Sequence, residues 1–146
     1  MSKLRKNSSF KDGRVNVLSE SKYLNDKTST PTHIPAMNIA FSGTLNGGFT
    51  SGLTMLAGPS KHFKTAIGLI MMKSYMDANP ESIVLFYDSE FGSPQQYFKS
   101  FGIDTSRVLH SPITNVEELK FDLINQLENI ERQDKVIIMI DSIGNL

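Results

Sequence analysis

Near the middle of the chain, eight residues combine a glycine, a lysine and a hydroxyl side chain with the spacing of a phosphate-binding loop. They are Gly58, Pro59, Ser60, Lys61, His62, Phe63, Lys64 and Thr65. Such a loop points its backbone N–H groups at the anion, and the helix that follows presents the positive end of its dipole. Lys64 would then reach the β- and γ-phosphates, and the Thr65 hydroxyl would be a ligand of Mg²⁺. The usual pattern has glycine where this chain has Phe63.

Taken alone, the octet is also compatible with a Gly-Pro turn before an ordinary helix. A second feature favours the phosphate loop. Residues 136–140 form a continuous apolar run that ends in Asp141, which predicts a strand buried on both faces with a carboxylate at its C-terminal end. Ligands of open α/β sheets bind at that end of the strands. Asp141 is therefore predicted to hold Mg²⁺, directly or through water, as the second acidic motif of P-loop NTPases does.

A third apolar run, residues 83–88, is followed by Ser89 and Glu90. A carboxylate just past a parallel strand can orient and activate the water that attacks the γ-phosphate of a nucleotide. Because metal binding and water activation are separate tasks, a second acidic group is expected, and Glu90 is the candidate. Considered alone, Glu90 would be interpreted as a solvated loop acid, so its assignment depends on the two other motifs.

The elements that must position these residues alternate between strand and helix. Strands are expected at residues 53–57, 83–88, 107–110 and 136–140. Helices are expected from Lys64 to the Asn79-Pro80 break, over residues 94–100, and after a capping box formed by Thr114 and Glu117. The apolar face of this last helix is expected to comprise Val116, Leu119, Leu123, Leu127 and Ile130. This alternation predicts an α/β fold with a parallel sheet, flanking helices and right-handed crossovers.

These motifs resemble those of the RecA-type recombinases, and within that family the UvsX group of T-even-like phages. The resemblance rests on residues 35–53, on the octet including Phe63, and on residues 85–92 and 140–146. It extends over residues 30–146 and is loose before them. It implies a P-loop NTPase with a RecA-like core. The implied activity is that of an ATP-dependent recombinase that binds single-stranded DNA and acts in homologous recombination, strand exchange and DNA repair.

The resemblance also implies roles for individual residues, with ATP and Mg²⁺ as the bound species. Lys64 and Glu90 would be the catalytic residues, and Thr65 and Asp141 the residues at the metal. Tyr97 stands where the family stacks an aromatic ring on adenine, although a core tyrosine on a short amphipathic helix is an equal alternative. Because the UvsX group also has phenylalanine at position 63, Phe63 is interpreted as a variant that keeps a conformation open to side chains. Its ring would point away from the nucleotide.

Composition narrows the class of protein. The chain has 146 residues, 15 basic and 15 acidic side chains, and no cysteine. It has no disulfide framework, and no apolar run has the length of a membrane span, so a cytoplasmic protein without a membrane partner is expected. If the chain is encoded by a phage, this would be the host-cell cytoplasm. The three histidines show no metal-ligand spacing, and His62 is expected to face solvent rather than phosphate.

The first thirty residues differ in charge from the rest. Residues 1–30 carry seven basic and three acidic side chains, a net charge of +4, whereas residues 31–146 carry a net charge of −4. Rich also in Ser, Asn and Thr, this segment is predicted to be a flexible basic arm with one short helix near residues 18–24. It could dock on a neighbouring subunit, contact nucleic acid, or simply be a solvated tail. The resemblance favours docking, because RecA-type recombinases join subunits through an N-terminal element.

Residues 31–146 are interpreted as the N-terminal part of a RecA-like ATPase core that is incomplete at its C-terminus. The family places a further strand between the phosphate-loop strand and the Asp141 strand, and no segment of this chain supplies it. A separate C-terminal half is therefore a possible partner, besides single-stranded DNA and a homo-oligomeric filament. Two other functions stay open: a non-catalytic fragment that binds or modulates filaments of a full-length recombinase, and a RecA-fold replicative helicase.

Overall fold

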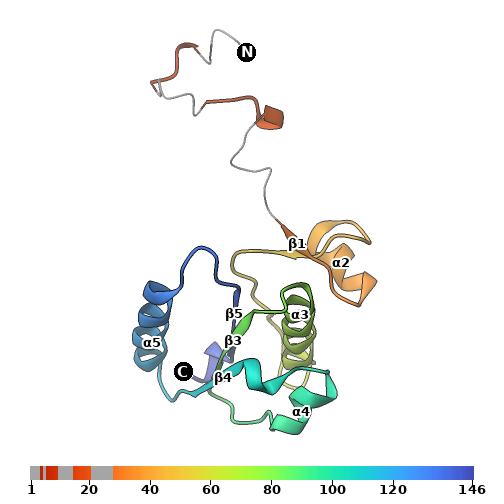
Figure 1. Cartoon of the computed structure of the whole chain (residues 1–146), viewed down its shortest axis with the longest axis vertical. Coiled ribbons are helices and arrows are strands. Elements are labelled where there is room, and N and C mark those ends of the chain that lie inside the picture. The colour runs from red at the N-terminus through yellow and green to blue at the C-terminus, as the bar shows by residue number, and fades with distance from the viewer. Residues whose placement is uncertain (1–3, 5, 10–14, 21–27) are drawn as a thin grey trace.

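The computed structural model describes residues 4, 6–9, 15–20 and 28–146. The sheet at its centre has three parallel strands, β3 (Ile83–Asp88), β4 (Val108–Pro112) and β5 (Val136–Asp141), in the order β4-β3-β5. Two of the strands expected from apolar runs are confirmed, and β4 begins one residue later than expected. The expectation of an α/β fold with a parallel sheet is also confirmed, and this arrangement is compatible with a RecA-like core (Figure 1).

Helices cover both faces of the sheet. The helices α3 (Lys64–Ala78) and α4 (Gln95–Ser100) lie on one side, and α5 (Val116–Asn129) lies on the other (Figure 1). Successive β3 side chains point to opposite faces, so Val84 and Phe86 pack toward α3 and α4, whereas Leu85 and Tyr87 pack toward α5. The result is two separate apolar cores with the sheet between them, which explains why β3 is apolar throughout.

The register of the three parallel strands aligns their C-terminal ends, where the candidate residues lie. Asp88, the last residue of β3, stands opposite Asp141 at the end of β5 and opposite Pro112 at the end of β4. Because the strands are parallel, the loops that leave them start at the same edge of the sheet. The loop that carries Glu90 therefore begins beside Asp141, and this edge of the sheet is the one at which a ligand is expected.

A small unit precedes α3. Strands β1 (Ser29–Thr30) and β2 (Phe49–Thr50) pair antiparallel, and α2 (Pro35–Ser42) lies between them in the sequence. Its buried centre is Asn38, whose Oδ1 accepts hydrogen bonds from the Thr32 backbone N–H (2.7 Å) and hydroxyl (2.8 Å). The Asn38 amide group donates to the carbonyls of Thr32 (3.0 Å) and Leu45 (3.1 Å). These bonds close the loop around α2.

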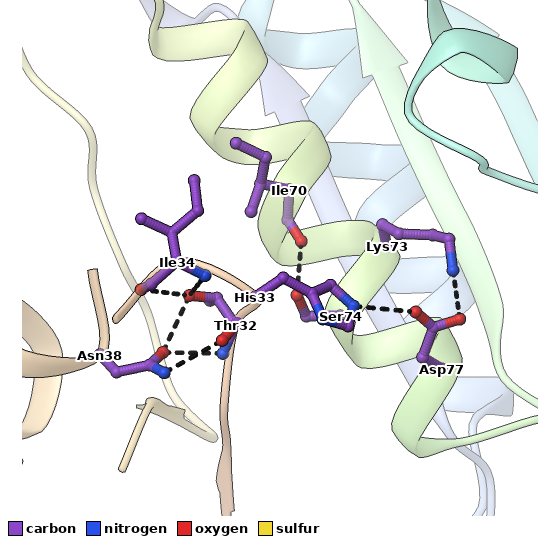
Figure 2. Close-up of polar contacts among 8 residues, drawn as sticks. All are labelled: Thr32, His33, Ile34, Asn38, Ile70, Lys73, Ser74 and Asp77. Atoms are coloured by element: carbon purple, nitrogen blue, oxygen red, sulfur yellow. Dashed lines mark hydrogen bonds and ion pairs between the residues drawn. The ribbon is translucent and has the colours of Figure 1, made fainter. Parts of the chain in front are cut away.

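His33 connects this unit to α3, as Figure 2 shows. Its Nε2 lies 3.2 Å from Oδ2 of Asp77, and Lys73, one turn earlier on α3, binds the other oxygen of the same carboxylate. The hydrogen bond from Lys73 is the largest of the effects that lower the pKa of Asp77, and His33 adds to it, while partial burial acts in the opposite direction. These contacts hold the unit before α3 against the helix that follows residues 58–63.

The expected strand at residues 53–57 is not formed. This segment has no regular structure, and the exposed fractions of Leu53 and Met55 are 96% and 80%. In the described structure this segment pairs with no strand, so its backbone has no ladder hydrogen bonds. For the same reason β5 is an edge strand whose residues 136–140 are half-buried, and the expectation that it is buried on both faces is wrong.

Three further expectations are corrected in detail. The cap of α5 lies one residue later than expected: Asn115 accepts the Glu118 N–H (2.9 Å), and the Glu118 carboxylate accepts the Thr114 N–H (2.9 Å). On α5, Leu119 is buried and Leu123 half-buried, whereas Val116 and Leu127 are about half exposed, so the apolar face is only partly covered. In the N-terminal arm, Leu18–Glu20 form a single 3₁₀ turn, and most of the predicted arm, including residues 21–24, lies outside the described residues.

Candidate functional site

The octet lies between the irregular segment 53–57 and the start of α3. Its first six residues are exposed, and Lys64 and Thr65, the first two residues of α3, are half-buried. The Lys64 ammonium group donates to the carbonyl oxygens of Gly58 (3.1 Å) and Pro59 (2.9 Å). The lysine therefore folds back along the loop and closes it into a ring, with its charge on the inner side.

Phe63 has a backbone conformation that the sequence interpretation did not allow. Its φ of 58° and ψ of 19° lie in the left-handed region, as does the φ of 64° at Lys61. The expectation that Phe63 keeps a conformation open to side chains is therefore wrong. The loop must turn sharply before the first helical residue, and this turn requires a positive φ whichever residue occupies the position. The ring is 77% exposed, and His62 faces solvent as expected, with its Nδ1 2.9 Å from the Ser60 carbonyl oxygen.

Thr65 and Asp141 meet although 76 positions separate them in the sequence. The Thr65 hydroxyl donates to Oδ2 of Asp141 at 2.7 Å. Burial raises the pKa of Asp141, and the negative charges of Glu90 and Asp88 act in the same direction, whereas the Thr65 hydrogen bond and the charge of Lys64 oppose the shift. A buried carboxylate that accepts a hydrogen bond from a threonine hydroxyl offers the oxygen ligands that a divalent cation prefers.

Glu90 lies on the loop after β3, next to the end of β5. Its side chain is exposed, and its Oε1 accepts a hydrogen bond from the Ser142 hydroxyl at 2.8 Å. Ser142 directly follows Asp141, and the peptide bond between the two is cis. The carboxylate predicted to activate water and the carboxylate predicted to bind metal are thus joined through one residue.

Asp88 is a structural residue of the site that the sequence interpretation missed. Its side chain is buried, and its Oδ1 accepts the backbone N–H groups of Glu90 (3.0 Å) and Phe91 (2.8 Å). His110 on β4 lies 3.3 Å from the other oxygen of Asp88. Asp88 therefore fixes the turn from which Glu90 projects. The signal in the sequence was an aspartate two residues before the candidate base, since aspartate side chains commonly bond to backbone N–H groups two residues on.

Tyr97 lies on α4 and is half-buried. Its ring contacts Phe101 edge-to-face, with the centroids 5.1 Å apart, and it packs against the apolar core between the sheet, α3 and α4. These are the contacts of a core tyrosine, one of the two alternatives that the sequence left open. Its stacking on adenine stays a prediction.

The residues present fit Mg²⁺. This ion prefers oxygen ligands and usually keeps several waters, with only one or two carboxylates from the protein. Thr65 and Asp141 offer one hydroxyl and one carboxylate, and the bond between them shows that both oxygens face the same point. Within the described part of the chain no group of three or more His, Asp or Glu side chains could hold a metal by itself. A dedicated protein cage is therefore not what this site offers.

A separate hollow of about 400 Å³ lies at the end of β3 and β4, beside α5. Its lining includes Tyr87, Ser111, Phe121 and Asp122, and none of the predicted site residues. The Tyr87 hydroxyl donates to Asp122 at 2.6 Å, and burial together with this carboxylate raises the pKa of Tyr87. Two of the polar groups that line the hollow, those of Tyr87 and Asp122, are thus paired with each other.

Comparison with known proteins identifies a relative from a phage. The chain is 52% identical over 129 residues to the "Recombination and repair protein" of Enterobacteria phage T4. The alignment covers 88% of this chain and 33% of the relative, so the chain spans about a third of the length of the curated protein that it matches. A scan against models of protein families finds no match. Across the described residues, no helix combines the length and apolar character needed to cross a membrane.

Proposed function

We propose that this chain provides the ATP-binding part of a UvsX-like, RecA-type recombinase, a protein that acts on single-stranded DNA in recombination and repair. The similarity to a phage recombination and repair protein supports the role in recombination or repair. The proposal goes further in assigning ATP and Mg²⁺ to the loop formed by residues 58–65. Strand exchange, DNA binding and filament assembly are proposed for the whole protein, because the alignment covers only 33% of the matched relative.

The observation that carries the nucleotide assignment is the contact between Thr65 and Asp141 at 2.7 Å. An unrelated Gly-Pro turn before a helix would have no reason to place its hydroxyl on the acid at the end of a parallel strand. In a nucleotide site the same contact has a purpose, because the hydroxyl and the carboxylate would both hold the Mg²⁺ that accompanies the nucleotide. The open α/β sheet supports the same location, since its ligands bind at the C-terminal ends of the strands.

Each residue then has a defined task. The backbone N–H groups of the loop and the first turn of α3 would hold the phosphates, and the Lys64 ammonium group would exchange its two carbonyl partners for phosphate oxygens. Thr65 and Asp141 would hold Mg²⁺, which neutralises charge on the phosphates when bound. Glu90 would orient the attacking water and accept its proton at the carboxylate.

Nucleotide binding and turnover by the purified chain test this proposal. Binding of Mg²⁺-ATP would be measured by calorimetry, and phosphate release with and without single-stranded DNA. Lys64→Ala should abolish detectable binding, because hydrogen bonds to a charged group contribute about 1.5–3 kcal/mol each. Lys99→Ala, which removes the same charge from the exposed end of α4, is the matched control and should bind as the wild type does.

Glu90→Gln separates the two tasks of the site. It should keep the affinity for Mg²⁺-ATP and lose hydrolysis, because the amide cannot accept the proton of the attacking water. Unchanged affinity of Lys64→Ala would show that the loop is not the nucleotide site. Loss of both binding and hydrolysis in Glu90→Gln would show that Glu90 supports the fold of the site rather than the chemistry.

One observation favours a second candidate, a non-catalytic module that binds full-length recombinase. The segment that delivers the chain to the phosphate loop, residues 53–57, lies outside the sheet and is mostly exposed, so the loop has no strand behind it. A chain that binds recombinase filaments in a pull-down and releases no phosphate from ATP would favour this candidate.

A further inference from the structure

Hydrogen bonds join the chain just after β3 to the end of β5 and the residue that follows it. A phosphate-binding site does not require these bonds. The Ser89 N–H donates to the Asp141 carbonyl at 2.9 Å, which continues the β3–β5 ladder by one residue. The Ser89 hydroxyl then donates to the Ser142 carbonyl at 2.7 Å and accepts the Ser142 N–H at 3.0 Å. We refer to Ser89 and Ser142 together as the serine clasp.

Both backbone groups of Ser142 are thus held by a single side chain. Two bonds to one hydroxyl, one from each of the peptide groups that flank the Ser142 Cα, leave the Ser142 backbone little freedom to rotate or to move away from β3. The Ser142 side chain is free of this arrangement, and its hydroxyl donates to Oε1 of Glu90 at 2.8 Å. The chain of contacts therefore runs from Ser89 to the Ser142 backbone, and from the Ser142 hydroxyl to the Glu90 carboxylate.

Glu90 needs such a support because of where it lies. Its side chain is exposed and has several rotatable bonds, so without a partner its carboxylate would sample many rotamers in water. Asp88 holds the backbone N–H of Glu90 and not its carboxylate. The fixed turn decides where the side chain starts, and the Ser142 hydroxyl decides where it ends.

We propose that Ser142 is the positioning residue of the Glu90 carboxylate, and that Ser89 holds Ser142 in the place where it can do so. The role in catalysis rests on the proposed ATP hydrolysis, whereas the orientation of Glu90 does not. The arrangement also couples two tasks through adjacent residues. Asp141, proposed to hold metal, ends β5, and Ser142, which orients the base, follows it directly, so the Glu90 carboxylate keeps its place relative to Asp141.

The orientation is tested without nucleotide by NMR. Side-chain scalar couplings of Glu90 report whether it occupies one rotamer or averages over several. The wild-type chain should show one dominant rotamer, and Ser142→Ala should show averaging. Ser142→Thr should restore the single rotamer, because the hydroxyl is kept and the extended backbone at this position (φ −129°, ψ 162°) accepts a β-branched residue.

Two more variants define the mechanism. Ser89→Ala should increase averaging of Glu90 when Ser142 is present and add little in the Ser142→Ala background, because it acts through Ser142. Ser106→Ala, which removes a hydroxyl from the distant turn after Asp104, is the control and should leave Glu90 unchanged. Averaging of Glu90 in the wild type, or a single rotamer retained in Ser142→Ala, would overturn the proposal.

Turnover supplies the catalytic test. Ser142→Ala should lower kcat about tenfold, part of the 10²–10⁴ that a placed general base contributes, with KM within about twofold of wild type. Ser142→Thr should recover most of kcat. A raised KM with unchanged kcat would overturn the positioning role. If the wild-type chain binds no ATP, the proposed function fails for this chain, while the NMR result still decides whether Ser142 orients Glu90.

Discussion

The left-handed backbone of Phe63 predicts that glycine at position 63 gives a more stable chain than alanine does, the reverse of the usual order. At φ 58° and ψ 19°, a residue with a Cβ atom is strained by about 1–2 kcal/mol, and glycine is not. Glycine in turn increases the freedom of the unfolded chain, which costs about 0.5–1 kcal/mol relative to alanine. With the middle of each range, the difference between the two effects favours glycine at this position by about 0.75 kcal/mol.

The ring of Phe63 contributes little to this comparison. It is 77% exposed, so about a quarter of its surface is buried, and full burial of such a side chain contributes about 1.5–3 kcal/mol. Removing the ring should therefore cost about 0.5 kcal/mol in either variant. Phe63→Ala is expected to lose about that amount, and Phe63→Gly is expected to equal or slightly exceed the wild type in free energy of unfolding.

Equilibrium unfolding in urea measures both variants against the wild type. A reference pair, Lys120→Ala and Lys120→Gly on the exposed face of α5, should give the opposite order, with alanine more stable by about 1 kcal/mol. The contrast between the two sites removes any general effect of glycine on the unfolded chain. If alanine at position 63 is as stable as glycine, the loop does not adopt the left-handed turn, and the strain argument is refuted.

Two further predictions concern the unit before α3 and its contact with α3. Gly48→Ala should destabilise the chain by about 1–3 kcal/mol, because the added Cβ would lie 1.9 Å from the Thr30 carbonyl oxygen. Gly92→Ala is the control and should not destabilise it, because the nearest atom to its added Cβ is 3.9 Å away. Equal melting temperatures of the two variants would contradict this prediction. Asp77→Asn should lower stability at neutral pH. Since the pKa of Asp77 is lowered in the folded chain, the stabilisation is present above its ordinary value of about 4 and is lost as the pH falls through its folded value. The stabilities of the variant and the wild type should therefore converge in acid, and a difference that stays constant from pH 7 to pH 2 would contradict the assignment.

Much of the architecture could be predicted because it depends on local pattern. The apolar run 83–88 forms β3, and the helix from Lys64 ends at Ala78, where proline two residues later had indicated a stop. The carboxylate at the end of β5 lies at the edge of the sheet where the sequence indicated it. These features follow from side-chain period and from residues that cannot continue a helix, so neighbouring elements hardly affect them.

The failures share a different cause. Residues 53–57 are apolar and resemble a strand, yet a strand needs a partner along its edge, and this segment pairs with none of the described strands. The half-exposed β5 has the same origin. At Phe63 the pattern suggested an ordinary side-chain conformation, but the path from the loop into α3 imposes a positive φ. In each case the outcome depends on what lies beside the segment in space.

The sequence by itself determined which residues could do chemistry, because side-chain type and spacing from a strand or helix end are properties of the chain alone. Lys64, Thr65 and Asp141 were identified in this way. Only the tertiary structure decided which of them touch, since the β3–β5 register brings groups from distant positions to one edge of the sheet. The bond of Ser142 to Glu90 is a product of that register, and the contact of Thr65 with Asp141 depends on the packing of α3 against β5. A hydrogen bond needs its two atoms within about 3 Å, and the sequence alone does not fix such distances.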